Sequence, residues 1–583
     1  MKIRGTLLGA VAVAGTVALA LAGCTTAAND GTTTTKGGTV TIAEVNEVTS
    51  FNYNTPQGNL DTNGQVNYLT QPTFYTLDDK FTILPNKDLG TYKKVSDDPL
   101  TIKYTLNSDA KWSDGKPMTA NDLLLAWAVN SCYYDSASFD ADGAVTTGVQ
   151  YFASAAGCLY KTSLPKVGDN NKSIQYTYDT PYVDWEIVPA IQLPAHVVAK
   201  EAGVTEDDFV KALNTVPQGD PSAPASAPDP TLAKVSAFVN TGYDATALPT
   251  DPALLVSGGP LMVTAWTPTQ SMTFEPNPEY KGTHSVKFSK LVMRFIGDAQ
   301  AQVTALQNGE VDAIQPQASA DTVKALQAVK GTNLYQGQQV AYDHLDLNFG
   351  SPTFSDPKVR EAFLLTVPRE DILNAIVTPV TPDAKVLNSL IFLPGQDGYD
   401  DSVKANGSSA YAKVDIDKAK QLLGGATPTV KILYNTKNPN RVDSFQAIQA
   451  SAAKAGITVV DGGDPKWSSL LAAGNYDASL FGWINPGVGN AAIPQLFQTA
   501  NPSNYNRYSN AKLSDLAVKT QTTLDAGKLL DEKKAIDAGA FADGYGLPLF
   551  QLPGLFAAGD ALKGVKYFGG QTGLVWNVWD WTK

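Results

Sequence analysis

The sequence predicts an α/β protein, because segments with the two-residue period of a strand alternate with segments of helical character. Residues 430–434 are strand-like, residues 443–455 are helical and residues 457–460 are strand-like again. Apolar side chains also alternate with Thr and Lys over residues 100–106, the pattern of a strand with one buried face. Because strands that alternate with helices are typical of βαβ units, we expect a mainly parallel sheet covered by helices.

The first residues of the chain predict an export signal. Lys2 and Arg4 precede an apolar stretch, residues 7–21, which is shorter than the ~20 residues that a membrane-spanning helix needs. Leu-Ala-Gly-Cys at 21–24 resembles a bacterial lipobox, which implies cleavage before Cys24 and a lipoprotein with diacylglycerol and palmitate-type acyl chains at that residue. Two or more acyl chains anchor a protein stably. An ordinary secretory signal with a chance cysteine is the alternative.

A tether and a large body follow the signal peptide of residues 1–23. Residues 24–38 are small, polar and low in complexity, which predicts a flexible tether. Cleavage would leave 560 of the 583 residues, room for three or four domains at ~150 residues each. With 43% hydrophobic and 17% charged residues, and no later apolar run of spanning length, we expect a folded body outside the cell.

Charge and motif content exclude several functions. The net charge of −13, or −15 once Lys2 and Arg4 are removed, disfavours nucleic acid as a partner. The three histidines, His196, His284 and His344, are scattered and form no metal-binding pair, so we expect neither a metal nor a cofactor. Motifs for a nucleophilic serine, a catalytic Cys-His arrangement and a phosphate-binding loop are lacking, which predicts that the protein is not an enzyme. A hydrolase that uses paired carboxylates stays an alternative.

The remaining cysteines predict a disulfide. If Cys24 carries lipid, Cys132 and Cys158 form an even pair in an oxidising compartment. Closing that loop would stabilise the fold by about 3 to 4 kcal/mol on the chain-entropy model. Two buried free thiols are the alternative, whereas a metal site lacks a further Cys or His at ligand spacing.

Residues 111–122 form a strand, a turn and a helix start in sequence. Asp114 and Gly115 are a turn pair, and Thr119 precedes Asp122 by the three residues of a capping box. In this order they resemble the "W-S-D-G-x-P-x-T-A-x-D" segment of family 5 extracellular solute-binding proteins. These are the oligopeptide, dipeptide and nickel receptors of ABC importers.

Further segments resemble the same family, in the same order, from about residue 39 to 583. His196 lies in one of them and is expected to pack or cap a helix, while Gly309 is expected to end a helix. A Pro-rich passage, residues 216–228, is expected to be a surface insertion. Ser257, Leu261 and Pro368 depart from the family pattern. The matching segments are residues 193–198, 257–263, 277–280, 306–312, 356–363, 369–372, 474–483 and 548–550.

The resemblance implies a bilobed periplasmic-binding-protein-like fold, of type II in its large three-domain variant. Two crossing strands would act as the hinge, and a ligand would be enclosed between domains I and III. Domain I would comprise residues 39–52, 188–295 and 545–583; domain II would be residues 53–187, and domain III residues 296–544.

The resemblance also implies the ligand-binding residues. In the peptide-binding members, extended segments of both lobes hydrogen-bond the backbone of the peptide. By position, the matching residues are Gln57, Gly58 and Asn59 in one lobe, and Trp467, Gly482, Trp483, Ile484 and Asn485 in the other.

One departure concerns the ligand's amine. Peptide receptors place an Asp two or three residues after the Gly-Trp pair, where it binds the free α-amine, but residues 484–490 contain no acid. An ammonium buried without a countercharge is unfavourable. A peptide ligand therefore requires another carboxylate, or a ligand without a free N-terminus.

We predict a monomeric receptor, lipid-anchored on the extracytoplasmic face of a bacterial cell membrane, that captures an oligopeptide for an ABC permease. An oligosaccharide receptor of the same fold is an alternative, because Trp and Asn suit sugar rings and hydroxyls. A lipid-anchored hydrolase and a sensor of signalling peptides are alternatives of other classes.

Overall fold

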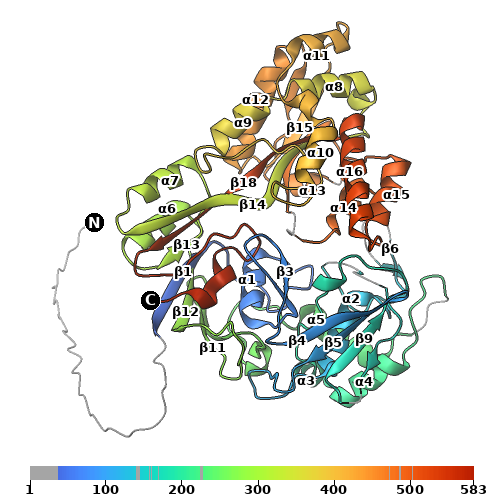
Figure 1. Cartoon of the computed structure of the whole chain (residues 1–583), viewed down its shortest axis with the longest axis vertical. Coiled ribbons are helices and arrows are strands. Elements are labelled where there is room, and N and C mark those ends of the chain that lie inside the picture. The colour runs from blue at the N-terminus through green and yellow to red at the C-terminus, as the bar shows by residue number, and fades with distance from the viewer. Residues whose placement is uncertain are drawn as a thin grey trace, which may run out of the picture. The chain divides into compact units, whose positions relative to one another are not determined.

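The structure is a computed structural model that describes most of the chain after residue 36 (Figure 1). Cys24, the predicted signal peptide and most of the predicted tether lie outside the described residues. The first strand begins at Gly37, so the tether ends two residues earlier than predicted. Among the described helices, none is both long and apolar enough to cross a membrane. The described residues are 37–139, 145–155, 158, 161–168, 170–223, 227–471, 473–484, 488–499, 501 and 503–583.

A ten-stranded sheet runs through the body of the protein (Figure 1). Its strands in spatial order are β10 (Leu261–Thr267), β11 (Ser271–Pro276), β12 (Phe288–Phe295), β1 (Gly37–Glu44), β13 (Ala313–Ile314), β18 (Gly546–Gly559), β14 (Thr332–Leu347), β17 (Ala478–Ile484), β15 (Thr429–Tyr434) and β16 (Thr458–Asp461).

The sheet is mixed, so the prediction of a mainly parallel sheet is wrong. Four neighbouring pairs are parallel, namely β12–β1, β1–β13, β17–β15 and β15–β16. The other five are antiparallel. The parallel pairs follow the predicted strand–helix alternation: β17, β15 and β16 form one end of the sheet, and β12, β1 and β13 lie inside the other end, which is completed by the antiparallel strands β10 and β11. The antiparallel pairs at the centre arise because the chain crosses the molecule on β14 and returns on β18.

Strands β14 and β18 join two lobes. Residues 332–338 of β14 pair with residues 553–559 of β18, and residues 342–346 pair with residues 546–551. The register shifts between these two stretches. A strand pair interrupted in this way is a natural place for bending.

The first lobe is built around one hydrophobic core that includes residues from Val40 to Trp581. A four-stranded sheet, β4-β5-β9-β8, contributes to it, and helices cover that sheet (Figure 1). The elements are β2 (Tyr75–Leu77), β3 (Ile83–Pro85), β4 (Gly90–Asp97), β5 (Leu100–Leu106), β6 (Ser138–Phe139), β7 (Val145–Thr147), β8 (Lys166–Val167), β9 (Ser173–Thr177), α1 (Asp61–Thr70), α2 (Ala120–Ser131), α3 (Ala195–Glu201), α4 (Glu206–Thr215) and α5 (Pro230–Thr241).

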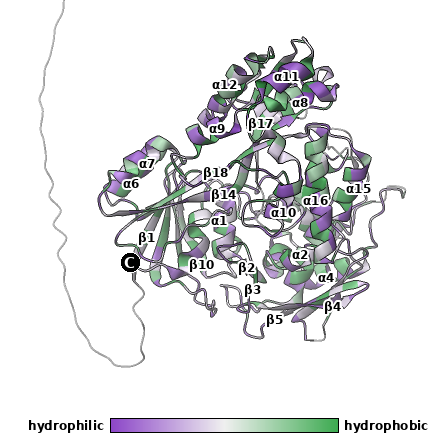
Figure 2. Cartoon of the chain, turned by 45° about the horizontal axis from the view of Figure 1, so that its top comes forward, coloured by the Kyte–Doolittle hydropathy of each residue, from purple (hydrophilic) through white to green (hydrophobic). Residues whose placement is uncertain are grey.

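The second lobe has its own core, whose buried residues lie between Leu345 and Phe550. Its helices carry hydrophilic and hydrophobic residues together (Figure 2), as expected of helices with one face on a core. They are α8 (Pro357–Leu365), α9 (Arg369–Ile376), α10 (Tyr399–Ala405), α11 (Ile416–Leu423), α12 (Pro439–Ala453), α13 (Trp467–Leu471), α14 (Ala492–Phe497), α15 (Ala511–Lys519) and α16 (Ala526–Asp543). Helices α6 (Ala299–Gln307) and α7 (Ala320–Gln327) pack in a smaller cluster with residues of β1, β13 and β18.

Several local predictions are confirmed. Thr119 and Asp122 form the capping box at the start of α2. His196 caps no helix, but its Nε2 lies 2.8 Å from Asp114 Oδ2 and so joins α3 to the predicted turn. Gly309 follows α6 with a φ of +70°.

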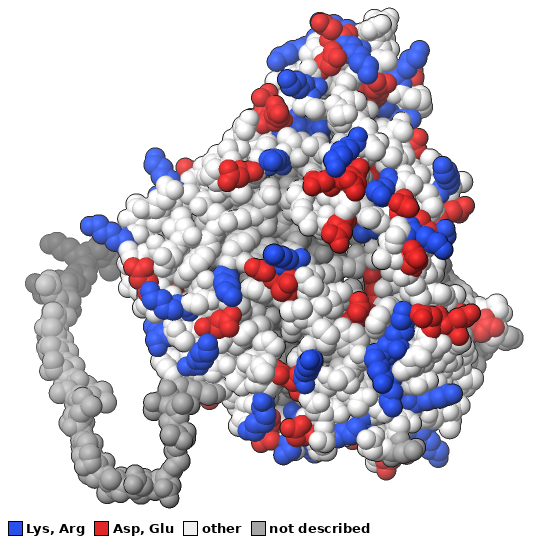
Figure 3. All heavy atoms as spheres, viewed as in Figure 1, with Lys and Arg blue, Asp and Glu red and all other residues white. Residues whose placement is uncertain are grey.

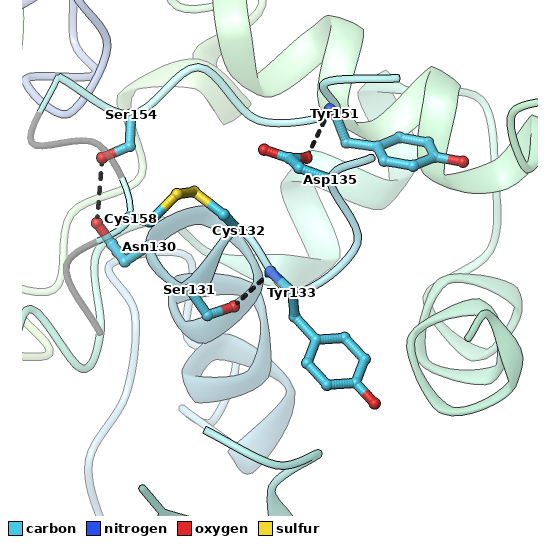
Figure 4. The surroundings of a disulfide bond; sticks show 8 residues. All are labelled: Asn130, Ser131, Cys132, Tyr133, Asp135, Tyr151, Ser154 and Cys158. Atoms are coloured by element: carbon cyan, nitrogen blue, oxygen red, sulfur yellow. Dashed lines mark hydrogen bonds between the residues drawn. A yellow bond between two sulfur atoms is a disulfide. The ribbon is translucent and has the colours of Figure 1, made fainter. Parts of the chain in front are cut away.

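The predicted disulfide is present in the structure. Cys132 at the end of α2 is bonded to Cys158, with their Cα atoms 5.2 Å apart (Figure 4). Nearby, Asp135 accepts a hydrogen bond from the backbone of Tyr151 at 2.9 Å. The bridge therefore lies beside a second, noncovalent link across the same loop.

Candidate functional site

Three neighbouring cavities extend from the second lobe, across the contact between the lobes, to the hinge. The middle cavity, of about 320 Å³, is lined by first-lobe residues such as Tyr75, Tyr182 and Trp576, and by second-lobe residues 488, 489 and 491. It shares Gly489 with a small cavity in the second lobe. At its other side it shares residues Phe568, Gly570 and Gln571 with a cavity of about 450 Å³ beside the hinge. The shared lining residues make the three cavities neighbours, and together we call them the cleft.

Hydrogen bonds close the cleft on one side. Asp184 of the first lobe accepts hydrogen bonds from Asn490 of the second lobe, from its backbone N–H at 2.8 Å and from its Nδ2 at 3.0 Å. Gln521 in turn donates from Nε2 to Asn490 O at 2.8 Å and accepts from the Val183 N–H at 2.9 Å. These bonds require that the lobes be in contact, so the structure shows the cleft closed.

Asp184 is buried, and burial raises the pKa of its carboxyl, while the hydrogen bonds from Asn490 and the charge of Lys533 oppose that shift. This carboxylate comes from the opposite lobe and bonds Asn490, the last residue of the acid-free stretch 484–490. Sequence reasoning missed it because a residue 306 positions away carries no local signal.

Lys533 on α16 supplies a cation to the second-lobe end of the cleft. Its Nζ lies 4.9 Å from the centroid of the Phe392 ring, and within the described part of the chain it forms no ion pair. Burial lowers the pKa of its ammonium, although the charge of Asp184 acts in the opposite direction. The arrangement can bind an anionic or hydrogen-bond-accepting group of a ligand.

Trp483, one of the predicted residues, lines the same end of the cleft as Lys533. Its ring is nearly parallel to that of Tyr505, with centroids 6.3 Å apart. Its buried Nε1 has no hydrogen-bond partner among the described residues. A large aromatic face with a free donor at its edge can pack against a ligand and also orient it.

The backbone beside Trp483 has one open edge. Residues 478–484 of β17 pair with β14, but on the other side β15 pairs only with residues 478–480. Within the described residues, no strand covers that second edge at 481–484. Gly482 and the backbone of Ile484 lie on it, whereas Asn485 lies outside the described residues. An unpaired strand edge is suited to binding an extended chain.

A buried ion pair leaves no room for a side chain at Gly482. Arg441 donates to the Asp343 carboxylate through Nε at 3.3 Å and Nη2 at 3.1 Å. A Cβ at Gly482 would lie 2.8 Å from Asp343 Oδ1 and 3.0 Å from Arg441 Nη2. The Arg441 guanidinium also lies 5.2 Å from the ring of Trp467. Trp467 lines none of the three cleft cavities and packs behind the β17 edge.

The structure places Gln57, Gly58 and Asn59 in a turn before α1. Gly58 donates its N–H to Thr55 Oγ1 and accepts from Asn63 Nδ2, both at 2.9 Å, so its backbone is engaged within the turn. Gln57 is exposed, and Asn59 lines an open cavity that adjoins the one beside the hinge. These residues and Trp483 line no common cavity.

The hinge end of the cleft is acidic. Glu44 and Asp61 line it, and among the described residues that line it there is no Lys, Arg or His. Glu44 is 9% exposed, and burial raises its pKa to about 7. On the face drawn in Figure 3, by contrast, charged residues of both signs are interspersed.

A further cavity, of about 240 Å³, lies within the first lobe. It is lined by Asp88, whose carboxylate accepts hydrogen bonds from the Tyr280 hydroxyl and the Thr283 N–H, both at 2.8 Å. Because its lining comes from one lobe, a ligand there would not hold the two lobes together. No group of His, Cys, Asp and Glu suited to a metal ion occurs in the described part of the chain.

The sequence is similar to those of known solute-binding proteins. The family model of "Bacterial extracellular solute-binding proteins, family 5 Middle" matches residues 85–505. The oligopeptide-binding protein OppA of Mycobacterium tuberculosis (strain ATCC 25618 / H37Rv) is 24% identical over 495 residues, which cover 82% of this chain and 72% of OppA.

Solved structures share the fold. The periplasmic EDTA-binding protein EppA aligns with a TM-score of 0.78 and 24% identity, covering 94% of this chain and 96% of EppA. The oligopeptide-binding protein AppA of Bacillus subtilis, in complex with a nonapeptide, aligns with a TM-score of 0.67 and 18% identity, covering 94% of this chain and 99% of AppA.

Proposed function

The chain belongs to the bacterial extracellular solute-binding proteins of family 5, which are transport receptors and not enzymes, and we propose that this member captures an oligopeptide for an ABC import permease. The observation that carries the proposal is the cleft, because its lining comes from both lobes. A ligand that contacts both lobes binds the closed form better than the open form, and this difference drives closure.

The chemistry of the cleft supports a peptide. The open edge of β17 offers backbone groups to an extended chain, independent of its side chains. The cleft also presents acids at the hinge end and Lys533 at the other, which suits a ligand with an ammonium and a carboxylate. OppA and the nonapeptide-bound AppA among the similar proteins favour the same class.

The remaining parts of the proposal concern location and assembly. The receptor would act as a monomer held at the extracytoplasmic face of the membrane by lipid on Cys24, with ATP hydrolysis supplied by partner subunits. Domain I would comprise residues 39–52, 188–295 and 545–583, with domain II at 53–187 and domain III at 296–544. The residues predicted to contact the ligand are Gln57, Gly58, Asn59, Trp467, Gly482, Trp483, Ile484 and Asn485. Of these, Trp483 lines the cleft, and we propose that the ligand contacts it together with the open edge of β17 at residues 482–484.

Ligand-induced stabilisation tests the proposal. The mature chain, with Cys24→Ser to prevent lipidation, would be melted with pools of tetrapeptides, with oligosaccharides and with nickel–histidine complexes. A ligand at a hundred times its Kd should add about 2.7 kcal/mol to the free energy of unfolding. We expect stabilisation by peptides. Stabilisation by sugars alone would establish the oligosaccharide receptor instead, and hydrolysis of the peptides during incubation would establish the hydrolase.

A further inference from the structure

We propose that Glu44, Asp61 and Gln65 form a binding site for the ammonium group of the ligand, at the end of the cleft beside the hinge. The proposal rests on the proposed function in one respect, that the ligand binds between the lobes. It assigns the amine to residues of the first lobe, far in sequence from the Gly-Trp segment at 482–483.

The three residues come from two elements that meet at the cavity. Glu44 is the last residue of β1, at the carboxyl end of the parallel strands β12, β1 and β13. Ligands of α/β proteins bind outside the carboxyl ends of such strands. Asp61 and Gln65 are the first and fifth residues of α1 and therefore share one face of that helix. All three line the cavity of about 450 Å³.

Gln65 shows that the site has unused hydrogen-bonding capacity. It is 4% exposed, and its Oε1 has no hydrogen-bond partner among the described residues. A buried acceptor without a donor is unfavourable by roughly 1–3 kcal/mol. The Gln65 side chain also contacts the Glu44 carboxylate, so this free acceptor lies beside a buried acid.

The two carboxylates favour a positively charged group as the hydrogen-bond donor that Gln65 Oε1 lacks. Glu44 accepts a hydrogen bond from the Val45 N–H at 3.0 Å, besides its contact with Gln65. Asp61 is exposed, lines the same cavity and makes no ion pair within the described part of the chain. An ammonium has three donors and no acceptor, so it can satisfy Gln65 Oε1 and both carboxylates together. Within the described lining, no cation of the protein already does so.

The position of the site connects the amine to closure. Residues 339–341 of β14 line the same cavity, and they occupy the register break between the two halves of the β14–β18 pair. An ammonium held by Glu44 and Gln65 would therefore bring the first residue of a peptide against the hinge. The rest of the peptide would extend through the middle cavity toward Lys533.

Matched ligands and variants test the site. The probes are one tetrapeptide pool with a free N-terminus, the same pool N-acetylated, and the same pool C-amidated, with affinities measured by calorimetry. We expect the wild type to bind the free pool at least tenfold more tightly than the acetylated pool. Glu44→Gln and Asp61→Asn should each reduce that ratio, and the double variant should bring it near one. The control Asp79→Asn, at an exposed turn of the same lobe, should leave the ratio unchanged.

The outcomes separate this inference from the proposed function. If the double variant melts as a folded protein and keeps the wild-type ratio, the ammonium site is refuted while peptide binding stands. A wild-type ratio of one would refute it in the same way. If no peptide pool binds in either form, the proposed function fails together with the site. Asp61→Asn alone remains informative if Glu44→Gln does not fold, because Asp61 is exposed.

Discussion

The carboxylate of Asp184 accepts hydrogen bonds from both the backbone and the side-chain amide of Asn490, which belongs to the opposite lobe. Both bonds exist only when the lobes touch. Asp184 and Asn490 therefore contribute to the free energy of closure, and through it to the apparent affinity for any ligand that binds the closed form.

Removing this contact should weaken ligand binding. We expect Asp184→Ala to raise the Kd of a bound peptide about tenfold, because hydrogen bonds to a charged group contribute about 1.5–3 kcal/mol and water replaces them only in part. Calorimetry measures the affinity, and small-angle scattering measures the fraction of closed protein. Asp179→Ala, an exposed acid on the same segment, serves as the control. If Asp184→Ala bound the peptide as tightly as Asp179→Ala, a role of Asp184 in closure would be contradicted.

Gly482 should tolerate no side chain. We expect Gly482→Ala to destabilise the protein by about 1–3 kcal/mol, because the added Cβ would displace the buried Asp343–Arg441 ion pair. Urea unfolding measures the change. Gly38→Ala in β1 is the matched control, since a Cβ there meets no atom within 4 Å. A Gly482→Ala protein as stable as the control would show that the ion pair relaxes freely.

Titration of Glu44 should lower the free energy of unfolding as the pH rises. Its pKa is about 7 in the folded protein, because of burial, and 4.5 as the ordinary value. Below pH 4.5 the Glu44 carboxyl is protonated in both the folded and the unfolded protein. Between pH 4.5 and 7 the carboxyl loses its proton only in the unfolded protein, so the free energy of unfolding falls. Above pH 7 this loss reaches about 3 kcal/mol.

Glu44→Gln should remove this loss. The stability difference between the variant and the wild type should grow in favour of the variant from pH 4.5 to pH 7.5, as urea unfolding at several pH values would show. Asp122, whose pKa burial also raises to about 7, is present in both proteins and cancels in the difference. A difference independent of pH would mean that Glu44 titrates normally.

Lys533 should select for a carboxylate. We expect Lys533→Met, which keeps the apolar stem, to weaken binding of peptides with a free C-terminus about tenfold and to leave C-amidated peptides unaffected, because charge-assisted hydrogen bonds are roughly twice as strong as neutral ones. Calorimetry with both peptide pools measures this. Lys534→Met, the neighbouring lysine on α16, is the control. Equal losses for both pools would indicate a role in packing.

The disulfide should stabilise the first lobe. We expect the double variant Cys132→Ser/Cys158→Ser to lose about 3 kcal/mol, because the bridge closes a loop with a sequence separation of 26 residues. Unfolding by urea, with and without a reductant, measures the loss. The reductant should destabilise the wild type and leave the double variant unchanged; an effect on both would point to another cause.

Local patterns predicted most of the elements. The strand at 100–106 is β5, and the alternation at 430–460 appears as β15, α12 and β16 within a few residues of the expected bounds. Each depends on side chains close together in sequence. The antiparallel centre of the sheet could not be predicted in this way, because β14 and β18 pair across about 200 residues of intervening chain.

The site was harder to predict for the same reason. Trp483 was found because it belongs to a recognisable segment, and it lines the cleft. Asp184, Lys533 and Glu44 come from three separate elements, and nothing in the residues around each indicates that they share a cleft. Their charge alone gave no signal, since most of the described Asp, Glu and Lys side chains are not buried.

The positions of the core residues along the sequence determine the order in which the two cores can form. Buried residues of the second core all lie between Leu345 and Phe550, whereas the first core contains both Val40 and Trp581, each with no exposed surface. During synthesis or export from the N-terminus, the second core is complete before the first can close. Loss of the last few residues would therefore leave the second lobe intact and open the first, so damage at one end of this chain would disable only the lobe that holds Glu44.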